Sequence, residues 1–146
     1  MRDLKRIRSR DNPRFKALRE LAGSTRERRK AGLALLDGVH LVGAYRASGG
    51  VPEQLILSDS GMANAQTAQL AAGASAQGAL VLADALFNDI AQLATPTGIV
   101  ALIRTPKPGP LPDTIERGVL LENIQDAGNL GEKLAEALRL KARRIS

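Results

Sequence analysis

The stretch LALLDGVHLVGAYR, residues 33–46, decides the fold class of this 146-residue chain. Leu33 to Asp37 form a short apolar run that predicts a buried strand, and Gly38 marks a turn. Val39 to Arg46 carry apolar residues at helical spacing, which predicts a helix whose inward side chains are Leu41, Val42 and Tyr45. A strand followed at once by a helix is the repeating unit of α/β domains.

The same alternation continues on both sides of this stretch. Upstream, Asn12 and Pro13 predict the start of a helix that ends at Gly23, and residues 26–30 are too charged to be buried. Downstream, the pattern predicts strands at 55–57, 79–82 and 99–103 and helices at 63–72 and 83–93. The last helix has an inward stripe of Leu86, Phe87, Ile90 and Leu93. We therefore predict a layered α/β domain that ends near Arg104.

A proline-rich segment separates this domain from the remainder of the chain. Residues 106–112 contain four prolines, which can continue neither a helix nor a central strand and act as a semi-rigid spacer. Residues 118–123 then predict a buried strand, 124–131 a polar loop and 132–144 a helix, the opening unit of an open α/β sheet. We expect a first domain at 1–105, a linker at 106–113 and the incomplete start of a second domain at 114–146.

Positive charge is concentrated at the start of the chain. Residues 1–30 hold 12 Lys and Arg against four acidic residues, a net charge of +8, whereas the whole chain carries +6. Such clustering is typical of proteins that bind a phosphate backbone, although a solvated basic face or attraction to an anionic membrane would also produce it. The chain has three aromatic residues, so we expect recognition of RNA shape and phosphates rather than base stacking. The candidate phosphate contacts are Arg8, Arg10, Arg14, Lys16, Arg26, Arg28, Arg29 and Lys30.

Composition argues against other classes of site. The chain has no cysteine and a single histidine, His40, which excludes disulfides and thiolate metal sites, and we expect no metal. It has no apolar run of about 18 residues and no secretory signal pattern, so we expect a cytoplasmic protein with no membrane partner.

Four segments resemble one enzyme family in the order expected for it. Residues 121–131, LENIQDAGNLG, resemble the first signature motif of the SpoU/TrmH RNA 2'-O-ribose methyltransferases, with Ala127 where that family usually has proline. Residues 7–18, 35–42 and 95–101 resemble elements of the substrate-binding domain that many members carry. The resemblance implies a three-layer α/β/α domain like the small ribosomal proteins that bind kinked RNA. It also implies a knotted, dimeric methyltransferase domain that uses S-adenosylmethionine.

The resemblance assigns one catalytic position. Asn129 matches the motif asparagine that lies beside the active site, but Ala135 stands where the family has its proposed acid/base arginine. The motifs that build the cofactor pocket would lie beyond Ser146, so we expect this chain to bind no cofactor and to be inactive alone. Either a chain limited to the substrate domain or a reading-frame change near residue 132 would explain the unfamiliar tail.

Three residues of the first domain have a structural reading and an RNA-binding one. Asn12 is either a helix cap or an RNA contact. His40 is also a candidate RNA contact, although a packed or capping role is favoured for it, and Gly38 is better explained by a backbone turn. Neither Arg28 nor Arg29 is expected to be buried, so replacing both should weaken RNA binding without unfolding the domain.

The sequence supports three functional hypotheses. The first is the RNA-docking part of an enzyme that methylates ribose in ribosomal or transfer RNA. The second is an RNA-binding module without catalysis, suggested by Ala135 and the missing pocket. The third is a protein-interaction domain whose basic arm meets an acidic partner. The first two fail if the arginines of residues 1–30 all pack against carboxylates.

Overall fold

A computed structural model describes residues 4–72, 78–93, 95–114 and 118 of the chain. The chain divides into two units, Met1–Lys107 and Pro108–Ser146. Almost all of the second unit lies outside the described residues, including the motif at 121–131, Asn129, and the strand and helix expected there. The described residues therefore belong almost entirely to the first unit.

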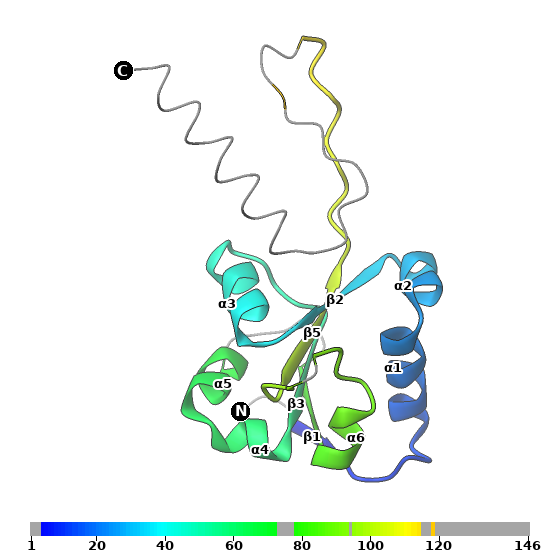
Figure 1. The fold of residues 1–146 in the computed structure, drawn as a ribbon, viewed down its shortest axis with the longest axis vertical. Coiled ribbons are helices and arrows are strands. Elements are labelled where there is room, and N and C mark those ends of the chain that lie inside the picture. Colours follow the sequence, from blue (N-terminus) through cyan, green and yellow to red (C-terminus); the bar gives the residue numbers. More distant parts are fainter. Residues whose placement is uncertain (1–3, 73–77, 94, 115–117, 119–146) are drawn as a thin grey trace. The chain divides into compact units, whose positions relative to one another are not determined.

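The first unit alternates strands and helices along the chain (Figure 1). The elements are β1 (Leu4–Ile7), α1 (Pro13–Gly23), α2 (Thr25–Ala31), β2 (Leu33–Asp37), α3 (Val39–Ala47), β3 (Gln54–Ser58), α4 (Asp59–Ala63), α5 (Ala65–Ala71), β4 (Ala79–Leu82), α6 (Asp84–Asn88) and β5 (Ile99–Arg104).

The strands form one mixed sheet in the order β1-β4-β3-β5-β2. β1, β4 and β3 are parallel, and β5 is antiparallel to both of its neighbours, β3 and β2. The carboxyl ends of β1 to β4 therefore lie along one edge of the sheet, together with the start of β5. We call this the carboxyl edge.

Apolar side chains fill both faces of the sheet. Phe15 and Leu18 of α1 and Phe87 of α6 pack on one face, in a cluster with Ile56, Leu80, Val100 and other sheet residues. On the other face, Val42 of α3 packs with Leu55, Leu57, Ile99 and Ala101, and Leu70 of α5 lies against this second cluster. The predicted layered α/β domain is confirmed, with helices on both sides of a central sheet.

Several predicted elements differ in extent. The sequence pattern did not predict β1, and residues 25–31, predicted only to be unburied, form helix α2. The helix predicted at 63–72 corresponds to α5, which begins at Ala65 because the Asn64 side chain accepts hydrogen bonds from the amides of Gln66 and Thr67; α4, at Asp59–Ala63, was not predicted.

The helix predicted at 83–93 ends at Asn88. Its expected last turn is replaced by a connection in which the buried Asp37 carboxylate accepts hydrogen bonds from the amides of Gln92 and Leu93. Leu93 is consequently 44% exposed, and its predicted place on the inward stripe is wrong.

Leu41 was also wrongly predicted to face inward. It is 54% exposed, because α3 turns Val39, Val42 and Tyr45 toward the sheet, three residues apart, and Leu41 falls outside that stripe. Gly38 precedes this helix with a φ of +103°, which confirms the predicted turn.

Candidate nucleic-acid interface

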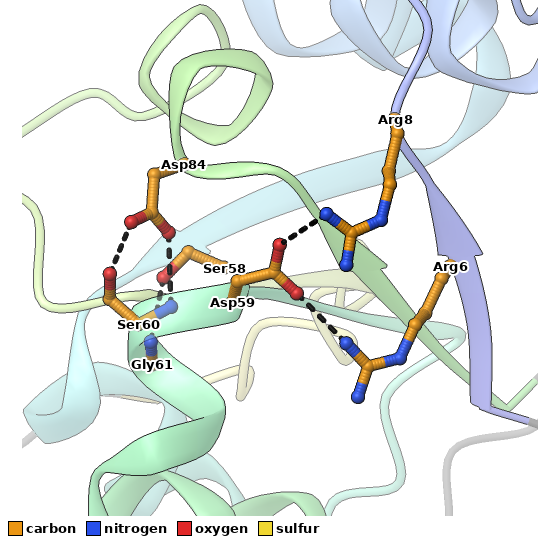
Figure 2. A network of polar contacts seen from close by, with 7 residues as sticks. All are labelled: Arg6, Arg8, Ser58, Asp59, Ser60, Gly61 and Asp84. Carbon is orange, nitrogen blue, oxygen red and sulfur yellow. Dashed lines mark hydrogen bonds and ion pairs between the residues drawn. The ribbon is translucent and has the colours of Figure 1, made fainter.

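Arg8 and Arg10 follow β1 and lie at the carboxyl edge of the sheet. Arg8 Nη1 lies 3.5 Å from Asp59 Oδ2, and Arg10 Nε lies 3.0 Å from Asp89 Oδ2. Arg6 shares the Asp59 carboxylate, with its Nη1 3.0 Å from Oδ1 (Figure 2). Both predicted arginines keep more than half of their side chains exposed, so the carboxylates hold them without covering them.

Asn12 has the structural role that the sequence left open. Its side-chain oxygen accepts hydrogen bonds from the amides of Arg14, at 2.9 Å, and Phe15, at 3.4 Å, and so caps the start of α1. Beyond the cap, Arg14 is exposed and Lys16 lies 3.6 Å from the Asp11 carboxylate. Arg19 lies over the Phe15 ring, 5.8 Å from its centroid.

α2 is a short helix fixed at both ends by its caps. The Ser24 hydroxyl accepts from the amide of Glu27, and Gly32 closes the helix with a left-handed φ of +68°. No residue of α2 is buried, and the residues Arg26, Arg29 and Lys30 are exposed to solvent.

Arg28 is not buried, as expected, but it differs from its exposed neighbours in having backbone partners. Its Nη1 donates to the carbonyl oxygens of Leu21, at 2.8 Å, and Ala22, at 2.7 Å, and its Nη2 donates to Thr25 Oγ1. These carbonyls belong to the last turn of α1, where helical partners are absent. Arg28 is therefore half-buried and joins α1 to α2.

The cations thus fall into two groups. Those at the carboxyl edge have carboxylate partners, whereas a second group on the consecutive helices α1 and α2 has no ion-pair partner among the residues described. We call the second group the α1–α2 basic surface; it consists of Arg14, Arg19, Arg26, Arg29 and Lys30. A cationic surface therefore stays free, and the condition that would have excluded RNA binding is not met.

His40 lies apart from this surface. It is the second residue of α3, which packs on the opposite face of the sheet from α1. The side chain is exposed and α3 has no side-chain cap, so the favoured packed or capping role is wrong.

A polar network at the carboxyl edge was not found from the sequence. Both oxygens of the Asp84 carboxylate accept from Ser60, one from its amide at 3.0 Å and the other from its hydroxyl, and Ser58 Oγ accepts from the amide of Gly61 at 2.8 Å (Figure 2). The hydrogen bonds from Ser60 lower the pKa of Asp84 below its ordinary value of 3.8, so the group is ionised at neutral pH.

This network borders a pocket of about 180 Å³. One of its lining residues, Gly98, makes a close backbone contact: a Cβ built on Gly61 would lie 2.3 Å from the Gly98 oxygen, so only glycine fits at position 61. The lining residues come from three segments far apart in the sequence and include Ser60, Asp84, Phe87, Asn88, Pro96 and Gly98.

Neither a metal site nor a membrane span is found in the described part of the chain. No group of three or more His, Cys, Asp or Glu side chains is arranged there to hold a metal ion. Among the same residues, no helix combines the length and apolar character needed to cross a membrane.

Residues 12–101 match the family described as the MRM3-like substrate binding domain. The chain belongs to this family. The match covers the α1–α2 basic surface and the whole of the polar pocket, and it leaves out Arg6, Arg8 and Arg10. The unpaired cations of α1 and α2 therefore lie inside the boundaries of the family match.

Solved structures with the same fold come from larger proteins. The chain is similar to a crystal structure of an RNA 2'-O ribose methyltransferase, with 25% identity and a TM-score of 0.63 over 86% of this chain and 48% of the other. It is also similar to the SpoU methyltransferase AviRb from Streptomyces viridochromogenes (21% identity, TM-score 0.57, 66% of this chain and 36% of the other). A third similar structure is an rRNA methyltransferase from Sinorhizobium meliloti (23% identity, TM-score 0.55, 68% of this chain and 36% of the other).

The chain thus spans about half the length of the first of these proteins and about a third of the other two. No curated protein matches it at a significant level. The resemblance to SpoU/TrmH enzymes drawn from the motifs is confirmed by the MRM3-like family match and by these structures.

Proposed function

We propose that this chain is the RNA-docking part of an RNA 2'-O-ribose methyltransferase of the SpoU/TrmH type. The observation that carries the proposal is the α1–α2 basic surface, which presents unpaired cations within a domain of the MRM3-like substrate-binding family. Exposed Arg and Lys without ion-pair partners release counterions when they meet phosphates, which is the main source of affinity for RNA. The substrate would be ribosomal or transfer RNA.

The proposed division of labour follows the chain. Residues 1–105 would dock the RNA, 106–113 would link, and 114–146 would begin the catalytic domain; the division into units at Lys107 and Pro108 supports this arrangement. Docking would use the α1–α2 basic surface together with Arg8, Arg10 and Lys16, whose side chains stay exposed. Asn12 and His40 would add at most local contacts, since Asn12 is already a cap.

S-adenosylmethionine would supply the methyl group in the intact protein, which we propose to be a cytoplasmic homodimer. The pocket at the carboxyl edge, at about 180 Å³, is smaller than the roughly 300–1,000 Å³ of ordinary cofactor sites. It therefore does not fit this cofactor. Asn129 would lie at the catalytic site, by its match to the family motif.

RNA binding by the 146-residue chain tests the docking role. Fluorescence anisotropy with a structured RNA should give an affinity that falls steeply between about 50 and 200 mM salt, as expected for several phosphate contacts. Binding that ignores salt, or a folded chain that binds no RNA, contradicts the proposal.

The alternative is an RNA-binding module without catalysis, which Ala135 favours because the family's arginine is absent there. Methyl transfer by a chain extended with a complete second domain separates the two. In that protein, Asn129→Ala should reduce turnover far more than RNA affinity. An extended, folded protein that binds S-adenosylmethionine and RNA but transfers no methyl group supports the module.

A further inference from the structure

The polar pocket at the carboxyl edge has the size and lining of a site for one flat ring. Its volume of about 180 Å³ corresponds to roughly six waters at about 30 Å³ each. Pro96 and the accessible edge of Phe87, which is only 1% exposed, supply the apolar part of the lining, and Gly98 adds backbone to it. An unstacked base is recognised by such a combination of an apolar surface and polar groups at its edge.

The polar groups of the pocket select for hydrogen-bond donors. A carboxylate has about four acceptor positions, and Ser60 occupies one on each oxygen of Asp84. One acceptor position therefore remains on each oxygen. Asp84 is exposed and can accept from a ligand, whereas its negative charge repels a phosphate entering the pocket. Asn88, also exposed in the lining, can donate or accept through its amide.

Arginines adjoin this pocket. Asp59, which pairs with Arg8, is the neighbour of Ser60 in the chain, and Asp89, which pairs with Arg10, is the neighbour of Asn88. Figure 2 shows Asp59 between the Ser60–Asp84 contact and the two arginines of β1 and its end. A guanidinium has five N–H donors. The side chains of Arg8 and Arg10 are 66% and 58% exposed, so both keep donors for phosphates beside a bound base.

We propose that this pocket binds one unstacked RNA base that carries an exocyclic amino group, with the Asp84 carboxylate accepting from that group and Arg8 and Arg10 contacting the adjacent phosphates. The inference rests on the proposed RNA binding and adds base selection to it. The α1–α2 basic surface would supply affinity without regard to sequence, and the pocket would distinguish cytosine, adenine and guanine from uracil, which lacks the amino group.

Binding of short oligocytidylate and oligouridylate strands of equal length tests the proposal, because the two probes have the same phosphates. The full 146-residue chain should bind oligocytidylate about ten- to a hundredfold more tightly, the effect of one hydrogen bond to a charged acceptor. Asp84→Asn and Asn88→Ala should each bring the ratio of the two dissociation constants close to one. Glu20→Gln, which removes an exposed carboxylate on α1, is the matched charge control and should keep the ratio.

The outcomes separate this inference from the proposed function. Failure of the unmodified chain to bind either strand or structured RNA overturns both. If the chain binds RNA but binds the two strands equally tightly, base binding by the pocket is contradicted and the proposed function is not. The same holds if the preference for oligocytidylate persists in both Asp84→Asn and Asn88→Ala. Thermal unfolding of Asp84→Asn shows whether loss of its bonds to Ser60 disturbs the fold. If it does, Asn88→Ala decides, since its side chain has no hydrogen bond to another described residue.

Discussion

The guanidinium of Arg28 donates a hydrogen bond of 2.7 Å to the carbonyl oxygen of Ala22 and thereby ties α2 to the last turn of α1. Its neighbour Arg29 has no such contact among the described residues and is exposed. Two adjacent arginines in a basic segment thus have different roles: Arg28 stabilises the helix pair, and Arg29 remains available to a ligand.

Replacing each arginine separately should separate these roles. Arg28→Ala should lower the free energy of unfolding by about 1–2 kcal/mol, because helix-end carbonyls lose charged donors. Arg29→Ala should change it by less than about 0.5 kcal/mol, as for other surface positions. Urea unfolding followed by circular dichroism measures both, and equal losses would mean that Arg28 is not a structural residue.

RNA binding should depend on position and not only on charge. Arg29→Ala should reduce the slope of log affinity against log salt by about one, the effect of losing one phosphate contact. Lys107→Ala removes one exposed cation outside the α1–α2 basic surface and serves as the matched control. Similar effects of the two changes on anisotropy titrations would show that net charge alone decides the affinity.

Gly98 should tolerate no side chain. Its φ is +88°, and a Cβ there would lie 2.7 Å from the Cα of Gly61, so Gly98→Ala combines backbone strain with a clash. We expect a loss of about 2 kcal/mol or more in unfolding free energy. Gly23→Ala is the control, because nothing lies within 4 Å of a Cβ at that position. A Gly98→Ala protein as stable as Gly23→Ala would contradict the close contact.

The bond between Ser60 and Asp84 should give stability a defined dependence on pH. The pKa of Asp84 is lowered in the folded state, so its contribution is complete above the ordinary aspartate pKa and is lost as pH falls toward the folded value. The difference in melting temperature between the unmodified chain and Asp84→Asn should therefore shrink below about pH 4. A difference that is constant across acidic pH would mean that ionisation of Asp84 does not matter.

Sequence patterns were sufficient where burial fixes an element. The run from Leu33 to Asp37 became β2 with the predicted bounds, although it was predicted to be buried and only Asp37 is; the other four residues are half-buried. The helix after it extends only one residue beyond the prediction. β1 was not predicted because Ile7 is its only buried residue, and an edge strand that contains Lys5 and Arg6 has no alternation of apolar residues to recognise. α2 was not predicted for a related reason: this helix is stabilised by its caps at Ser24 and Gly32 and has no apolar stripe.

The site was less predictable than the fold. Clustered charge indicated the cations of α1 and α2, but it could not separate Arg28, whose partners are backbone carbonyls, from Arg29. The polar pocket joins residues near 58–61, 84–88 and 96–98, which the order of the strands brings together. The polar residues 58–60 at the end of β3 were visible in the sequence as a possible site. Only the order of the strands in the sheet shows that Asp84 lies next to them.

The position of β5 constrains how this domain is made in the cell. β5, the last of the described strands to be synthesised, lies between β3 and β2, so until Arg104 has left the ribosome β2 has no neighbour in the sheet. A nascent chain that ends before β5 leaves the edges of β3 and β2 that β5 will cover without hydrogen-bond partners. Other unfolded chains or chaperones can bind to such unpaired strand edges.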